Sequence, residues 1–393
     1  MMRRFESLLL PLRLSWRQLR AERARLLAAM AGVMFACVLV FMQIGFRAAL
    51  FDSATSLLSA MRAELFLLNP LTTASFRPEP LPRIRAHQAL GIDAVRQAVP
   101  VYMAQVTWRN PENGTRRTIQ LVAFDIESDA MGFSGLPALA DALKQPDAVA
   151  FDRRSRPEFG DVARLLEARQ GTPLPVQIGG RQMNVMGLVD IGPSFGADGN
   201  LVLSETNFRR LLPNRDFSSA DLVALRLQPG ADPADVQARL RALLPPDVVV
   251  LTQPDLVAWE RRYWEEATPI GFIFTFGSLM GLIVGMVIVY QILFSDIASH
   301  LREYATLKAM GYSNGYLARV VLSAALVLAV LGFVPGAVAS AILYDVVGSA
   351  TFLPLGMSWG RGALVFSLIF GMCAAAGLLA MRKLRDAQPA DMF

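Results

Sequence analysis

Four stretches of the sequence contain no charged residue. They span residues 26–46, 267–295, 320–344 and 362–381 and are 21, 29, 25 and 20 residues long. With a rise of about 1.5 Å per residue, helices of these lengths measure roughly 30 to 44 Å, enough to cross the hydrocarbon of a bilayer. Buried core helices rarely run so far without a charge, so the pattern predicts four transmembrane helices.

Basic residues flank the first and the last of these stretches. Seven arginines precede the first stretch against only two glutamates, and three basic residues follow the last one. Because basic residues near span ends stay on the cytoplasmic side, both termini are predicted to be cytoplasmic, which agrees with four spans. Residues 47–266 and the loop 345–361 are then outside, and residues 296–319 and 382–393 are inside. The net charge of +5 comes largely from these anchors and does not indicate a nucleic-acid binder.

Residues 1–25 carry large apolar side chains among the arginines. These are Phe5, Leu8, Leu9, Leu12, Trp16 and Leu19. Their helical spacing predicts an amphipathic helix in the headgroup layer, and the long apolar run that follows predicts an uncleaved anchor rather than a signal peptide. The two cysteines, Cys37 and Cys373, fall inside predicted spans, so the large domain outside must fold without disulfides.

The segment between the first two spans, residues 47–266, alternates strand and helix patterns. Hairpins are predicted at "NPENGT" and "GGRQ", and helices after the N-cap residues Ser204 and Asp232. A last helix opening at Pro254 is expected to continue into the second span as a stalk. The fold class is therefore a membrane protein with four transmembrane helices and a large α+β domain inserted between the first and second spans. Residues 125–220, richer in loops and hairpins, are interpreted as an inserted subdomain.

Several kinds of chemistry are excluded by the residue types. Only three lysines occur and none follows a glycine, so a phosphate-binding Walker A loop is absent and any ATP must be bound by another chain. With two histidines and no HExxH or CxxC motif, a metal site is not expected. We therefore expect a non-catalytic chain that binds no cofactor of its own.

One motif would indicate an enzyme. The stretch "GPSFG", residues 192–196, matches the GxSxG pattern of serine hydrolases, with Ser194 as the nucleophile. That mechanism needs a strand–turn–helix elbow and a histidine, whereas a second strand pattern follows here and His87 is the only histidine in this segment. A loop is the favoured interpretation, and a membrane-anchored hydrolase is the alternative.

Three glycines recur at every fourth position of the second span: Gly277, Gly281 and Gly285. Small residues at this spacing let two helices approach closely. The partner helix could belong to the same subunit or to a second copy in a homodimer, and the sequence leaves both open.

A charged segment, residues 296–319, joins the second and third spans. Its first thirteen residues include Asp296, His300, Arg302, Glu303 and Lys308. Apolar residues, among them Leu307, recur at helical spacing, and Gly311 is expected to end the helix. A cytoplasmic helix between two spans, in a chain without an ATPase site, fits a contact with a separate motor. The alternative is a plain surface loop.

Within this segment, "EYATLKAMG" resembles the signature of the FtsX-like permease families, in which an acidic residue, a Leu-Lys pair and a glycine mark a coupling helix. Over nearly its whole length the chain resembles DevC-type permeases. The matching stretches are "RQLRAERARLLAAMAGVMFACVLVFMQIGF", "FDRRSRPEFG", "GPSFGADGNL", "YWEEATPIGFIF", "GLIVGMVIVYQILFSDIASHLREYATLKAMGY", "VLGFVPG" and "MRKLRDAQPADMF". In this comparison "GPSFG" is a family segment rather than a nucleophile.

The resemblance implies a homodimeric permease of the mechanotransmission, MacB-like class of ABC transporters in the bacterial inner membrane. Such permeases act with a DevA-like ATPase that binds ATP and magnesium, a DevB-like periplasmic adaptor and a TolC-like outer-membrane duct. In that class no substrate crosses the spans. Closure of the ATPases pushes the coupling helices, and the motion reaches the periplasmic domains, which drive cargo outward.

The resemblance also assigns residues to the ATPase contact. They are Glu303, Leu307, Lys308 and Gly311. We add three neighbours as further candidates: Asp296, His300 and Arg302. The cargo stays open among a glycolipid, a lipid, a lipoprotein and a hydrophobic drug. A second hypothesis is an ATP-driven regulator of a periplasmic enzyme, as FtsX-type proteins control wall hydrolases.

Overall fold

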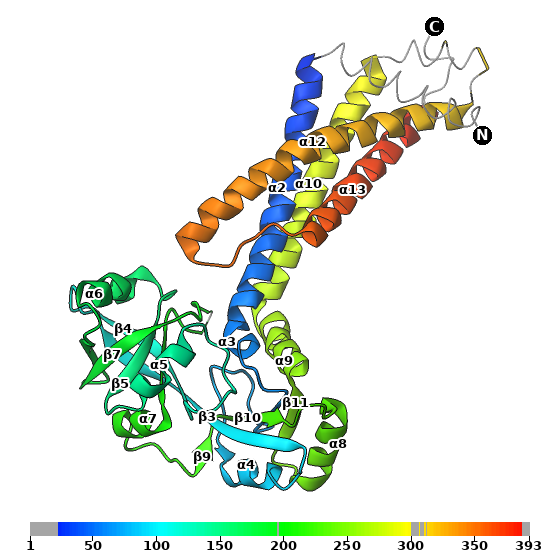
Figure 1. The fold of residues 1–393 in the computed structure, drawn as a ribbon. Coiled ribbons are helices and arrows are strands. Elements are labelled where there is room, and N and C mark those ends of the chain that lie inside the picture. The colour runs from blue at the N-terminus through cyan, green and yellow to red at the C-terminus, as the bar shows by residue number, and fades with distance from the viewer. Residues whose placement is uncertain (1–22, 195, 300–305, 307–309, 312, 387–393) are drawn as a thin grey trace. The chain divides into compact units, whose positions relative to one another are not determined.

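The computed structural model describes residues 23–194, 196–299, 306, 310–311 and 313–386 (Figure 1). The chain forms two compact units. One consists of residues 50–269 with 351–354, and the other contains the apolar helices. The predicted amphipathic helix lies outside the described residues except for its last three positions.

The membrane unit is built from four long helices: α2 (Arg23–Ala54), α10 (Pro269–Ser299), α12 (Asn314–Thr351) and α13 (Trp359–Asp386). All four are long and apolar enough to cross a membrane, which confirms the four predicted apolar helices. Helices α2, α12 and α13 extend beyond their uncharged stretches at both ends, because the polar and charged residues there remain helical. Helix α10 begins two residues inside its stretch, at Pro269, and extends beyond it only at the other end, to Ser299.

The helices pack closely through glycines around α2. A Cβ added at Gly332 of α12 would lie 2.5 Å from the Val33 side chain, and one at Gly336 would lie 2.8 Å from Cys37. The buried core of this unit draws on all four helices and includes both cysteines. Without side chains at these glycines, α12 and α2 approach more closely than larger residues would allow.

The second unit is the α+β domain. Its strands are β1 (Leu65–Leu68), β2 (Leu81–Pro82), β3 (Val95–Arg109), β4 (Arg116–Phe124), β5 (Ala148–Asp152), β6 (Leu174–Ile178), β7 (Arg181–Val189), β8 (Asn200–Ser204), β9 (Ser219–Ala220), β10 (Leu222–Leu227) and β11 (Val249–Thr252). Its helices are α3 (Ser56–Ser59), α4 (Ile84–Ala89), α5 (Leu136–Leu143), α6 (Val162–Ala168), α7 (Glu205–Leu211), α8 (Pro233–Leu243) and α9 (Gln253–Glu266), with a 3-10 turn at Pro157–Phe159.

Nine strands form one sheet in the order β11-β1-β10-β3-β4-β8-β5-β7-β6. The long strand β3 joins two halves of this sheet, because its first part pairs with β10 and its second part pairs with β4. An additional pairing of β3 with β6 closes the strands of the second half into a ring. Helices α4 and α8 cover the half that contains β1, β10 and β11.

Several local predictions are confirmed. The two hairpins are formed by β3 with β4 and by β6 with β7. Ser204 caps α7 by accepting a hydrogen bond from the Asn207 amide, and Asp232 caps α8 through the Ala234 amide. The interpretation of residues 125–220 as an inserted subdomain stays an interpretation; four strands of the ring, β5 to β8, lie in this range.

The predicted continuous stalk is wrong. Helix α9 ends at Glu266 and α10 begins at Pro269, so two helices replace the single one that was expected. Proline has no amide hydrogen for the helical ladder, and it disfavours the helical conformation of the residue before it. Pro269 therefore begins a new helix at its first turn.

Candidate functional site

The residues predicted to contact an ATPase lie mostly outside the described residues. This applies to His300, Arg302, Glu303, Leu307 and Lys308. Asp296 is half-buried in the last turn of α10, three residues from its end. Gly311 is exposed and has a φ of +91°, a conformation that glycine adopts without strain. The ATPase contact thus remains a prediction.

The three glycines of α10 face α2 of the same chain. A Cβ at Gly277 would lie 2.6 Å from the Gln43 side chain, and one at Gly281 would lie 3.4 Å from the Leu39 Cβ. At Gly285 the added atom would lie 2.5 Å from the Ala36 Cβ. The stripe therefore packs within the subunit.

Away from the spans, segments that carry the family resemblance meet in the α+β domain. They are residues 152–156 of "FDRRSRPEFG", the loop 190–200 and helix α9. The end of α2 and residues 75–76 join them. We call these five segments the junction; Phe195, within the loop, lies outside the described residues.

Asp152 holds the loop in place. Its side chain is completely buried, and its carboxylate accepts hydrogen bonds from the amides of Ile191 at 3.0 Å and Gly192 at 2.9 Å. The same carboxylate accepts from Asn200 Nδ2 at 2.8 Å and from the Arg154 amide at 3.1 Å. Four donors replace the water that this buried anion has lost.

Ser194 is part of a turn. Its amide donates to the Ala197 carbonyl at 2.7 Å, and its hydroxyl oxygen accepts from the Ala197 amide at 3.2 Å. His87 lies on α4, where its ring nitrogen is 3.4 Å from the Arg83 carbonyl, and it lines a different cavity from Ser194. A strand, β8, follows the loop rather than a helix. The loop interpretation fits this geometry, and the hydrolase alternative does not.

Phe76 packs between the loop and α9. A Cβ added at Gly196 would lie 3.0 Å from the Phe76 Cβ, so the loop approaches this side chain as closely as glycine permits. The Phe76 ring stacks on Trp264 at 5.4 Å between centroids and meets the edge of Tyr263 at 5.9 Å. Such aromatic contacts add about 0.5 to 1.5 kcal/mol each beyond area burial.

Glu260 of α9 lies beneath this aromatic cluster. Only 1% of the residue is exposed, and its carboxylate accepts from the Ser75 amide at 2.8 Å and from Trp264 Nε1 at 2.9 Å. Burial raises the pKa of Glu260 above its ordinary value, and these hydrogen bonds offset part of that effect. Glu260 thereby links α9 to residues 75–76.

The end of α2 is attached to the same place. Ser53 donates from its hydroxyl to the Pro193 carbonyl at 2.8 Å, and Asp52 pairs with Arg261 of α9. The end of α2, which follows the first predicted span, and α9, which precedes the second, are thus joined to each other within the junction. No local signal in the sequence marked Asp152 and Glu260 as buried, because each is followed directly by two arginines.

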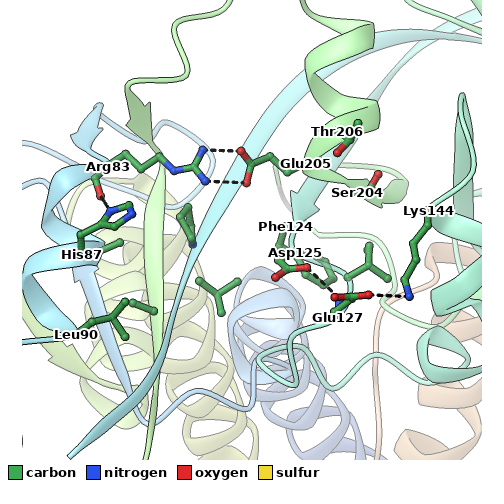
Figure 2. Close-up of a pocket in the computed structure, with 15 residues that line it drawn as sticks. Arg83, His87, Leu90, Phe124, Asp125, Glu127, Lys144, Ser204, Glu205 and Thr206 are labelled. Carbon is green, nitrogen blue, oxygen red and sulfur yellow. Dashed lines mark hydrogen bonds and ion pairs between the residues drawn. The ribbon is translucent and has the colours of Figure 1, made fainter. Parts of the chain in front are cut away.

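A separate cleft of about 510 Å³ lies between the two halves of the sheet (Figure 2). Residues 98–100 of β3 line it, with α4 on one side and the start of α7 on the other. Arg83 reaches across to Glu205 with a closest distance of 2.6 Å, and Lys144 pairs with Glu127 at 2.8 Å. Because both cations already have carboxylate partners, the cleft does not offer a free anion site.

Metal chemistry finds no support in the described part of the chain. No group of three or more histidine, cysteine, aspartate or glutamate side chains there could hold a metal ion.

Comparisons with protein families agree with this architecture. Residues 26–243 match the MacB-like periplasmic core domain, and residues 275–389 match the FtsX-like permease C-terminal domain. The first match alone covers more than half of the chain, so the chain belongs to the MacB-like and FtsX-like permeases. It is accordingly a membrane subunit of the ABC permease type, and its family implies an ABC ATPase as partner.

Two solved structures are similar to part of the chain. One is the periplasmic region of MacB from Actinobacillus actinomycetemcomitans, with 13% identity, a TM-score of 0.37 and coverage of 50% of this chain and 91% of that one. The other is the extracellular domain of the ABC-type transporter YknZ from Gram-positive bacteria, with 15% identity, a TM-score of 0.33 and coverage of 48% and 99%. No curated protein matches the chain.

Proposed function

We propose that the chain is the permease subunit of a DevC-type tripartite ABC exporter. It transmits the motion of a separate cytoplasmic ATPase to the α+β domain, which drives a glycolipid, a lipid or a hydrophobic compound outward from the periplasm. The observation that carries the proposal is the junction, where α2 contacts the loop 190–200 through Ser53, and α9 contacts Phe76, which packs against the same loop. Movement of either helix relative to the domain would displace this loop.

The composition of the four apolar stretches supports a role in transmitting motion. None of the four apolar stretches contains an aspartate, glutamate, lysine, arginine or histidine. Transmembrane paths for ions or protons are marked by such residues. A chain without them fits the transmission of motion better than the conduction of a charged substrate.

The proposed assembly is a homodimer in the bacterial inner membrane with both termini in the cytoplasm. Its partners are a DevA-like ATPase that binds ATP and magnesium, a DevB-like adaptor and a TolC-like outer-membrane duct. The proposed ATPase contact is the segment that includes Glu303, Lys308 and Gly311. An acidic and a basic residue in this segment suit a polar, reversible contact.

The test is a pull-down of the tagged full-length protein from native membranes in mild detergent, followed by mass spectrometry. Recovery of an ABC ATPase together with a periplasmic adaptor is expected. Recovery of an ATPase with a wall hydrolase, and no adaptor, would replace the exporter by the regulator of a periplasmic enzyme. Recovery without any ATPase would contradict both functions.

Coupling is tested by Glu303→Ala and Lys308→Ala. Each variant should still fold but should lower the stimulation of the partner ATPase by about fivefold or more. About fivefold is the lower end of the range of typical allosteric coupling. Asp345→Asn, on the last turns of α12, is the matched control and should leave stimulation unchanged. Equal stimulation in all variants would show that the charged segment is only a loop.

A further inference from the structure

The membrane unit contains an apolar groove of about 670 Å³. Helices α2, α12 and α13 contribute to it, with the residues that precede α13. Its lining includes Phe41, Phe333, Ala337, Ala341, Ala363 and Phe366. By the order of the chain, the groove lies toward the end of the spans at which residues 50–269 leave the membrane.

Side-chain size explains the groove. Its floor is aromatic, since the rings of Phe41 and Phe333 are 6.0 Å apart and those of Phe333 and Phe366 are 5.1 Å apart. Small residues of α12 and α13, such as Ala337 and Ala363, leave the space above these rings unfilled. Ligand pockets in proteins have volumes of about 300 to 1,000 Å³, so the groove is large enough for a hydrocarbon chain.

The mouth of the groove is amphipathic. Trp359, the first residue of α13, lines the groove and is 97% exposed, as is typical of tryptophans at the level of lipid headgroups. Ser358 also lines the groove, and its hydroxyl accepts from the Arg361 amide at 3.2 Å. The mouth therefore offers both apolar and polar contacts.

Arg361 supplies a positive charge beside this mouth. Its guanidinium lies 5.7 Å from the centre of the Tyr344 ring and donates to the Gly356 carbonyl. Within the described residues, no carboxylate lies at ion-pair distance from Arg361. A guanidinium binds phosphate through paired, parallel hydrogen bonds, and a carbonyl contact does not neutralise its charge.

We propose that the groove binds one acyl chain of an anionic phospholipid whose phosphate lies against Arg361. The apolar floor takes the chain, and Trp359 and Ser358 meet the headgroup region. The lipid comes from the leaflet on the side of the α+β domain. This inference does not depend on the proposed exporter function, because it concerns a site that can be occupied without ATP or a partner chain.

The headgroup is tested by native mass spectrometry of the purified full-length protein with added dioleoyl phosphatidylglycerol or dioleoyl phosphatidylcholine. The wild type should retain phosphatidylglycerol about fivefold better, the effect expected of one basic residue near a membrane surface. Arg361→Gln should abolish this preference, and Arg361→Lys should keep most of it. An equal preference in the wild type and Arg361→Gln would overturn the role of Arg361.

The chain-binding groove is tested by a matched pair of substitutions on α13. Ala363→Phe fills the groove, whereas Leu364→Phe adds a similar ring at an exposed neighbouring position outside the lining. Ala363→Phe should reduce retention of both lipids severalfold, and Leu364→Phe should not. Unchanged lipid retention in Ala363→Phe would contradict the proposal. A change of oligomeric state in Ala363→Phe, without a loss of lipid, would also contradict it and would show that the groove is a protein interface. Equal thermal stability of the two variants serves as the folding control.

Discussion

At the scale of single residues, two buried carboxylates of the junction have different surroundings. Asp152 accepts from three backbone amides and one asparagine, so its hydrogen bonds tie several segments of the loop to one side chain. Glu260 accepts hydrogen bonds from the Ser75 amide and from the Trp264 indole. Each arrangement leads to a separate prediction.

Asp152→Asn should destabilise the α+β domain by about 1 to 3 kcal/mol, because the new amide group would face donors that then lack an acceptor. The measurement is the midpoint temperature of unfolding of the full-length protein in detergent. Asp198→Asn is the matched control, since Asp198 forms only a half-exposed ion pair with Arg156 and should contribute about 0 to 1 kcal/mol. Equal midpoints for the two variants would show that Asp152 does not organise the loop.

Glu260 should make stability depend on pH. Its pKa is raised above the ordinary value of 4.5 by burial, so the folded state binds this proton more tightly than the unfolded chain does. The resulting stabilisation is complete below the ordinary pKa and is lost as pH rises through the raised pKa. Glu260→Gln lacks this dependence and also loses an acceptor for one of the two donors.

The midpoint temperature of Glu260→Gln should therefore lie below that of the wild type. The difference between the two midpoint temperatures should narrow as pH rises from about 4 to about 8, because this range spans ordinary and raised carboxyl pKa values. Unfolding scans of both proteins across this range provide the measurement. A gap that widens with pH would mean that the carboxylate form is the one stabilised in the fold.

At the scale of elements, close helix packing depends on glycines. The stripe of α10 meets α2, and two glycines of α12 meet α2 as well. The break between α9 and α10 has an equally local cause in Pro269. By contrast, α2 is one uninterrupted helix from Arg23 to Ala54 and crosses the boundary between the two units of the chain.

Gly285→Ala should weaken the packing of the membrane unit. The new Cβ would lie 2.5 Å from the Ala36 Cβ and 2.7 Å from Met372 Sδ, and such overpacking typically costs about 1 to 3 kcal/mol. Gly371→Ala is the control, because nothing lies within 4 Å of its added Cβ and alanine favours a helix by up to about 1 kcal/mol. Thermal stability in detergent should fall for the first variant and stay equal or rise for the second. If Gly285→Ala were instead more stable than Gly371→Ala, close packing would not be the reason for a glycine at position 285.

At the scale of the whole molecule, the proposed function requires that movement of a helix reaches the α+β domain. The junction offers a path, because Ser53 attaches the end of α2 to the loop and Phe76 lies between the loop and α9. Removing the Phe76 ring would leave the helices and the sheet intact while loosening this contact.

Phe76→Ala should reduce transport by the reconstituted complex by about tenfold, within the range of allosteric coupling energies, while ATP hydrolysis is maintained. Leu71→Ala in the same segment is the control, because its side chain is 74% exposed and should not matter. Parallel loss of hydrolysis and transport in Phe76→Ala would indicate a general defect rather than uncoupling.

The sequence alone determined features that depend on neighbouring residues. Uncharged stretches predicted the four apolar helices, because transferring charges into a bilayer is costly wherever they occur in the fold. Turn glycines predicted the two hairpins, and Ser204 and Asp232 predicted two helix starts, because caps and tight turns form within a few residues. The proposed ATPase contact at Glu303 and Lys308 also rests on the sequence alone.

Only the tertiary structure decided how distant segments meet. The Ser75 amide and Glu260 are 185 positions apart in the chain, and Ser53 and Pro193 are 140 apart. The continuation of β3 through both halves of the sheet, and the choice of α2 as the partner of Gly285, likewise depend on pairings that no local pattern specifies. Local propensities act over one or two turns, whereas the junction and the lipid groove arise from packing surfaces that exist only after the chain has folded.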